Sequence, residues 1–223
     1  MPGMETSPGL RETKKLRTRR HLADTALEMF LERGFGEVSV AEIAAAAEVS
    51  KPTLFRYFPS KEDLVLDRFA DHQDEAARVV RARPAGLTPV RALHEHFRTA
   101  LAGRDPITGL CDHPDVVAFQ RLLYTTPDLA DRLQHYTARE VELLTEELLP
   151  EYGSPLEARL AALHLVTVRR ELGRENWRRI AGGRTADALY PRALADADRA
   201  FGMLATGLDA ADAHQSWKGP RRP

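Results

Sequence analysis

Residues 39–58 read SVAEIAAAAEVSKPTLFRYF, and this stretch predicts two short helices joined by a tight turn. Ser39 is followed three residues later by Glu42, which is the spacing of a capping box at a helix start. A second start signal follows at Ser50, and Pro59 ends that helix because proline cannot continue it. The stretch therefore has the size and the start signals of a helix-turn-helix.

The two predicted helices divide their residues between an inner and an outer face. The small alanines at 44–47 let another helix approach closely, and Leu54 and Phe58, four residues apart, would both face inward. The first part of the second helix carries polar or compact residues, which suit a DNA groove better than a protein core. These residues are Lys51, Pro52, Thr53, Arg56 and Tyr57.

The rest of the chain also reads as helices. Alanine, leucine, glutamate and arginine are abundant and favour helix, whereas alternating strand patterns are almost absent, so we expect an all-α fold. The two helices of the motif are predicted at 40–47 and 50–58. Along the rest of the chain we expect further helices at 17–33, 61–81, 89–102, 114–125, 127–149, 155–181 and 188–208.

Composition excludes several classes of protein. There is no run of about 18 apolar residues for a membrane span, and the first residues lack the apolar core of a secretory signal. The single cysteine, Cys111, excludes an intramolecular disulfide and a multi-cysteine zinc site. We therefore expect a soluble cytoplasmic protein with no metal and no cofactor.

The net charge of −1 at pH 7 conceals a local basic run. Between positions 11 and 21 only Glu12 opposes the basic side chains. Such a run is either a solvated tail or an arm that binds nucleic acid. The basic residues are Arg11, Lys14, Lys15, Arg17, Arg19 and Arg20.

Residues 26–64 read ALEMFLERGFGEVSVAEIAAAAEVSKPTLFRYFPSKEDL, and here the sequence resembles the TetR family of bacterial transcriptional regulators. The resemblance extends from Arg17 to about Leu66. It implies a homodimer that binds a double-stranded DNA operator and a small-molecule effector. The implied layout is a disordered tail at 1–10, a helix-turn-helix DNA-binding domain at 11–64, a helical ligand-binding and dimerisation domain at 65–210, and a flexible tail at 211–223.

The family pattern, carried over by position, implies a set of DNA contacts. Ser39 could instead act only as a helix cap, Thr53 and Tyr57 only as structural residues, and Lys61 only as a solvated lysine. The implied contacts are Ser39, Lys51, Pro52, Thr53, Arg56, Tyr57 and Lys61, with Arg17, Arg19 and Arg20 from the arm.

The sequence departs from the family pattern at two positions. Many members have glycine where Glu48 stands, and a left-handed backbone there costs another residue about 1–2 kcal/mol. We therefore expect Glu48 to extend the end of the preceding helix. A frequent tyrosine is Phe55 here, which loses a phosphate hydrogen bond but leaves a thymine-methyl contact open.

The larger domain would enclose a mostly apolar cavity, as ligand sites generally do. Each residue proposed for the cavity wall could instead be an ordinary core residue, and Arg121 could instead be an exposed surface arginine. Residues 113–133 resemble the subgroup of the family with acyl-CoA-like ligands, which implies an apolar tail and an anionic head. The candidates for the cavity wall are Phe97, Phe119, Arg121, Leu122, Leu123, Tyr136 and His164.

The last two helices are where the family dimerises, through a four-helix bundle. One predicted stripe is Leu156, Leu160, Leu163 and Thr167, and the other is Leu189, Leu194, Ala197, Phe201, Leu204 and Leu208.

Two other functions stay open from the sequence. One is a helix-turn-helix regulator without an effector. The other is an all-helical enzyme, for which Cys111 and His113 are the only local hint of a metal site, while His94 and His96 point to different helix faces.

Overall fold

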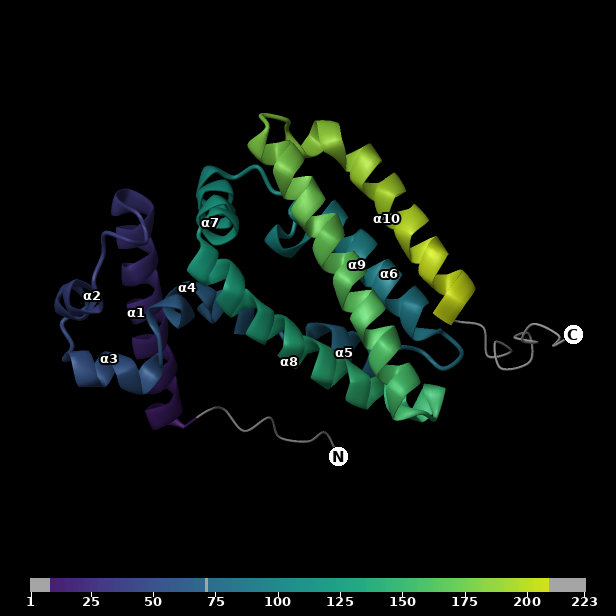
Figure 1. Ribbon diagram of the computed structural model, residues 1–223, viewed down its shortest axis with the longest axis horizontal. Helices are drawn as coiled ribbons and strands as arrows, with labels where there is room; N and C mark the ends of the chain where they lie inside the picture. Colours follow the sequence, from purple (N-terminus) through teal and green to yellow (C-terminus); the bar gives the residue numbers. More distant parts are fainter. Residues whose placement is uncertain (1–8, 71, 209–223) are drawn as a thin grey trace, which may run out of the picture. The chain divides into compact units, whose positions relative to one another are not determined.

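The computed structural model describes residues 9–70 and 72–208, and within them every regular element is a helix (Figure 1). The predicted all-α class is therefore confirmed. The helices are α1 Leu10–Arg33, α2 Val40–Ala46, α3 Lys51–Tyr57, α4 Lys61–Ala70, α5 Glu75–Arg81, α6 Pro89–Ala102, the 3₁₀ helix η1 Pro106–Thr108, α7 Pro114–Thr125, α8 Pro127–Tyr152, α9 Pro155–Ala181 and α10 Ala186–Leu208.

The chain divides into two compact units. Among the described residues, the first unit contains residues 9–70 together with Arg121–Leu133, and the second contains residues 72–120 and 134–208. We call these the helix-turn-helix unit and the helical unit. Of the two predicted tails, residues 1–8 and 211–223 lie outside the described residues.

Three helix boundaries differ from the prediction. Helix α1 begins at Leu10 rather than near Arg17, because the basic arm consists mostly of good helix formers that follow Gly9 directly. The predicted helix 61–81 is interrupted between α4 and α5, where His72, Gln73 and Asp74 form a turn. Helix α8 continues to Tyr152, since Pro150 lies in its last turn and removes only one backbone donor.

The core of the helix-turn-helix unit follows the predicted helical spacing. Leu22, Ala26 and Phe30 lie on one face of α1 and are buried. The inner residues of α3 and its cap, Leu54 and Phe58, are each 0% exposed. This burial fixes which side of α3 remains in solvent.

The core of the helical unit contains three residues of the predicted dimerisation stripe on the last helix, so these three are not available to a partner. Leu189, Ala197 and Phe201 of α10 are buried in this unit's own core, where the Phe201 ring lies 5.0 Å from that of His94 and 6.0 Å from that of Phe97. Helical spacing correctly identified an apolar face, but that face packs against α6 of the same chain.

Among the described residues, no helix combines the length and the apolar composition that a membrane span requires.

A cluster of charged side chains lies within the helical unit, and no local sequence pattern indicates it. The Arg169 guanidinium donates to Glu140 Oε1 at 3.0 Å and to Glu75 Oε2 at 3.3 Å, and all three side chains are largely buried. Arg170 also donates to Glu140, and His96 Nε2 lies 3.4 Å from Glu75 Oε1. Arg169 thus neutralises two carboxylates that come from α5 and α8.

The same cluster shifts two pKa values. The His72 side chain and the Arg169 guanidinium lower the pKa of Glu75, against the opposing effect of burial. Burial lowers the pKa of His96, although the nearby Glu75 carboxylate opposes that shift. Both shifts favour a charged Glu75 beside a neutral His96 at neutral pH.

Replacing Arg169 tests how much this cluster stabilises the fold. Arg169→Ala should lower the free energy of unfolding by about 3–5 kcal/mol, because it leaves two buried carboxylates without their shared partner. The matched control Arg178→Ala removes an exposed partner of Glu175 on the same helix and should change it by at most about 1 kcal/mol. Urea denaturation followed by circular dichroism measures both, and equal effects would contradict this account.

Candidate nucleic-acid interface

Helix α2 begins with the predicted capping box. Ser39 Oγ accepts a hydrogen bond from the Glu42 backbone N–H at 3.2 Å, and Glu42 Oε2 accepts one from the Ser39 N–H at 2.8 Å. The backbone and side chain of Ser39, followed by Arg33, lower the pKa of Glu42 to about 2. Ser39 is therefore a helix cap in this structure, and it is also exposed at the start of α2.

The turn between α2 and α3 corrects the prediction for Glu48. Its φ is +55°, so the residue adopts the left-handed conformation instead of extending α2. The Glu48 N–H bonds the Ala45 carbonyl at 3.1 Å, and the Val49 N–H bonds the Ala44 carbonyl at 2.9 Å. These two bonds form a Schellman motif, which satisfies the last carbonyls of α2 and offsets the backbone strain.

Helix α3 presents a polar face to solvent. Ser50 Oγ accepts from the Thr53 N–H at 3.2 Å and lies 2.8 Å from the Thr53 hydroxyl. Lys51, Pro52 and Arg56 are exposed, as a helix that reads a DNA groove requires. The remaining two predicted contacts of this helix, Thr53 and Tyr57, are half-buried.

Phe55 belongs to the same outer face, although the sequence analysis gave it little weight. Its side chain is 41% exposed, and Lys51 Nζ lies 5.9 Å from the centre of its ring. The exposed Phe55 ring therefore adds an apolar surface to the outer face of α3, whereas Leu54 of the same helix is buried. The position of Phe55 four residues after Lys51 could have indicated this shared face.

The basic residues predicted at the edges of the interface differ in their exposure and in the contacts that they already make within the protein. Arg17 and Arg20 are exposed on α1, as phosphate contacts require. Arg19 is half-buried and bonds to Asp67 and to the Tyr57 carbonyl. Lys61 Nζ donates to the Phe35 carbonyl and lies 4.3 Å from the centre of the Phe35 ring.

The predicted cavity residues do not gather around either of two described grooves. Arg121, Leu122 and Leu123 belong to the helix-turn-helix unit, whereas the other candidates belong to the helical unit. Leu123 is buried and Arg121 is exposed. In the helical unit, Phe97 is buried in the core, Phe119 and Tyr136 are half-buried, and His164 is exposed.

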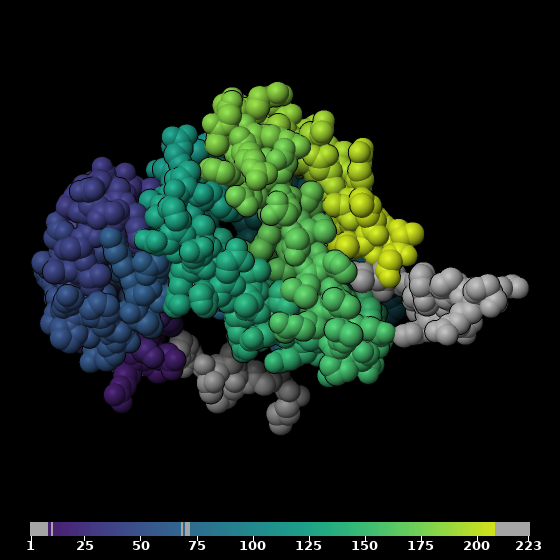
Figure 2. All heavy atoms as spheres, in the orientation of Figure 1, coloured from purple at the N-terminus to yellow at the C-terminus, as the bar shows by residue number. Residues whose placement is uncertain are grey.

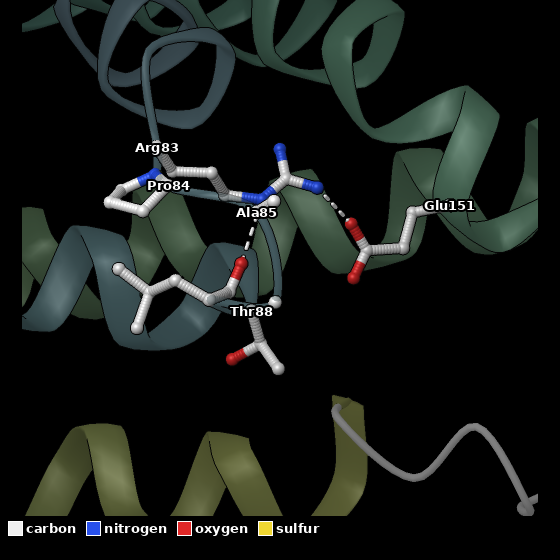
Figure 3. A pocket seen from close by; sticks show the side chains of 7 residues that line it. Arg83, Pro84, Ala85, Thr88 and Glu151 are labelled. Carbon is white, nitrogen blue, oxygen red and sulfur yellow. Dashed lines mark hydrogen bonds and ion pairs between the residues drawn. The ribbon is translucent and has the colours of Figure 1, made fainter.

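The grooves themselves lie in the helical unit and are open to solvent. One, of about 470 Å³, is lined by residues 83–88 and Glu151 (Figure 3). There Arg83 donates to the Leu87 carbonyl at 2.9 Å and pairs with Glu151, so its charge is already neutralised. The other, of about 540 Å³, is lined by His96, Thr99, Ala100, Gly103, Arg104, Asp105 and Pro106.

A capped, two-helix motif with an exposed basic face on its second helix defines a helix-turn-helix DNA-binding protein. Residues 22–67 match the family model of bacterial regulatory proteins of the tetR family. The chain is 34% identical over 171 residues to the HTH-type transcriptional regulator TcmR of Streptomyces glaucescens, and this alignment covers 75% of this chain and 74% of TcmR. The chain belongs to the TetR family of transcriptional regulators and is not an enzyme.

Solved structures share the fold at lower sequence identity. Salmonella enterica GusR has a TM-score of 0.55 at 21% identity, over 93% of this chain and 100% of GusR. NalD, the secondary repressor of the MexAB-OprM multidrug efflux pump in Pseudomonas aeruginosa, has a TM-score of 0.50 at 16% identity, over 84% and 97% of the two chains. These structures confirm the arrangement of an N-terminal helix-turn-helix followed by a helical C-terminal part.

Proposed function

We propose that this regulator is a homodimeric repressor that leaves a pseudo-palindromic operator when a small, largely apolar effector binds. The observation that carries the proposal is α3, whose Leu54 is buried while Lys51, Pro52 and Arg56 face solvent. Such a helix can enter the major groove without disturbing the core. Its place of action is the cytoplasm, because a bacterial operator lies there.

The proposed contacts divide into those that read bases and those that hold phosphates. Lys51, Pro52 and Thr53 lie at the start of α3, where a recognition helix meets base edges. Phe55 adds an apolar surface for a thymine methyl group. Arg56 and Tyr57 reach bases or the backbone.

The phosphate contacts flank α3. Ser39 caps α2, Lys61 begins α4, and Arg17 and Arg20 are exposed on α1. Phosphate contacts set the register on the duplex, and they make affinity depend on salt.

A DNA-binding assay tests the proposal directly. The protein should bind the duplex upstream of its own gene more tightly than an unrelated duplex. Lys51→Ala combined with Arg56→Ala should weaken binding at least tenfold. It should reduce the slope of log affinity against log salt by about 2, because the dimer loses the backbone contact of Arg56 in each subunit. Arg91→Ala, which removes an exposed arginine of α6, is the control for loss of a surface charge and should leave binding unchanged. Binding that is indifferent to sequence, or unaffected by the double variant, would refute the proposal.

The proposed dimer interface rests on apolar side chains that α9 leaves in solvent. Leu156, Leu160 and Leu163 are 67%, 44% and 39% exposed, and Met203 of α10 is 73% exposed. Helices α9 and α10 contact each other and lie at the surface of the helical unit (Figure 2). A second copy that covers these leucines would remove them from water, which favours association. The family's four-helix bundle provides that arrangement.

Sedimentation velocity tests the dimer. The unmodified protein should sediment as a dimer, and Leu160→Glu should shift it to a monomer, because a carboxylate would enter the apolar interface. Leu31→Glu places the same change at an exposed leucine of α1 and should leave the dimer intact. A monomeric unmodified protein, or a dimeric Leu160→Glu variant, would contradict the proposed interface.

The effector is proposed to be acyl-CoA-like. Support comes from the subgroup resemblance of residues 113–133 and from the exposed guanidinium of Arg121, which is open to an anionic head group. Induction then requires that the effector bind the DNA-free state more tightly than the operator-bound state.

Titration with acyl-CoAs tests the effector class. A medium- or long-chain acyl-CoA should release the bound duplex, whereas coenzyme A alone should not, because it lacks the apolar tail. Fluorescence anisotropy of a labelled duplex measures the release. If no chain length changes operator affinity, the result would favour another ligand class or a regulator without an effector.

A further inference from the structure

The Arg19 guanidinium is already bound by groups of this protein, whereas an arginine that binds DNA phosphate must present its guanidinium to solvent. Its Nε and one terminal nitrogen bond Asp67 Oδ1 at 2.7 and 2.6 Å, and the other terminal nitrogen donates to the Tyr57 carbonyl at 2.9 Å. The guanidinium carbon of Arg19 lies 4.5 Å from the centre of the Phe58 ring. One side chain of α1 therefore contacts the end of α3 and the side of α4.

These contacts lie at the C-terminal end of the recognition helix. Tyr57 is the last residue of α3, and Phe58 is its C-cap. The last carbonyls of a helix lack partners within it, and a cation near them is favourable. Arg19 supplies both the donor and the charge, which fixes the end of α3 against α1.

One turn before Asp67, helix α4 carries a second acid that pairs with an arginine. Asp63 and Asp67 are four residues apart on α4, so their side chains share one face. Asp63 is only 3% exposed and accepts from Arg132 Nε at 2.9 Å and from a terminal nitrogen of Arg132 at 3.0 Å. Arg132 lies in the part of α8 that belongs to the helix-turn-helix unit. Two acids of α4 thus join arginines from α1 and α8.

We propose that Arg19 and Arg132 are positioning residues for DNA binding, acting through Asp67 and Asp63 to set the placement of the recognition helix. In this proposal Arg19 does not bind a phosphate, unlike its exposed neighbours Arg17 and Arg20. Helix α4 connects the ion pair of Arg132 and Asp63 with the ion pair of Asp67 and Arg19, and Arg19 in turn bonds the Tyr57 carbonyl of α3. The inference rests on the proposed operator binding.

The salt dependence of operator binding distinguishes positioning from phosphate contact. With the upstream duplex, Arg19→Ala should weaken binding at least tenfold while the slope of log affinity against log salt stays as in the unmodified protein. Arg17→Ala should instead reduce that slope by about 2, because the bound dimer loses one phosphate contact from each subunit. Arg19→Lys keeps the charge but cannot bridge Asp67 and the Tyr57 carbonyl together, so it should also weaken binding severalfold without a change in slope.

Three results would overturn the role of Arg19. A slope reduced by about 2 in Arg19→Ala, with Arg19→Lys binding normally, would make it a phosphate contact. Unchanged affinity in variants that are folded by circular dichroism would leave it only a stabilising role. Loss of helix content in both variants would make it a residue required for folding.

A double-variant cycle tests whether Arg132 acts through the same chain. Arg132→Ala should weaken binding, and its combination with Arg19→Ala should weaken it by less than the product of the two single effects, because breaking either ion pair already releases α3. Arg139→Ala, which removes an exposed arginine of α8 paired with Glu142, is the control and should leave affinity unchanged.

The cycle also separates this inference from the proposal on which it rests. Effects of Arg19→Ala and Arg132→Ala that multiply, or no effect of Arg132→Ala, would overturn the chain while leaving operator binding intact. If the unmodified protein binds no duplex, the proposed function fails and this inference fails with it.

Discussion

Helix α3 has seven residues, and a helix of that length is not stable in water on its own. Its stability must come from its two ends and its inner face. Ser50 caps the first turn, Leu54 and Phe58 are buried beneath it, and Arg19 bonds the last carbonyl. Because these contacts use only one side of the helix, they also determine which side chains remain available for DNA.

The sequence was sufficient for the features that depend on neighbouring residues. The spacing of Ser39 and Glu42 predicted a capping box, and the box is present with both hydrogen bonds. The four-residue spacing of Leu54 and Phe58 predicted their burial. Such features are predictable because the interacting groups lie within a turn of each other. The predicted DNA contacts were selected by the family pattern, and they stay a prediction.

Features that depend on distant partners were not predictable in the same way. Backbone propensity suggested that Glu48 would avoid a left-handed conformation. That propensity does not include the two hydrogen bonds that close the turn and offset the cost of this conformation. Helical spacing found the apolar face of Phe201 without revealing that α6 of the same chain covers it. The cluster of Glu75, Glu140 and Arg169 joins positions far apart in the chain, so no local pattern indicates it.

In the proposed complex, two copies of the chain present α3 to successive major grooves of one operator. Selection of bound duplexes from a random-sequence pool by the purified protein is the sharpest test of this geometry. We expect enrichment of an inverted repeat whose half-site centres lie one helical turn, roughly 34–36 Å, or a multiple of it apart. Enrichment of a single asymmetric site, or no enrichment above the starting pool, would contradict it.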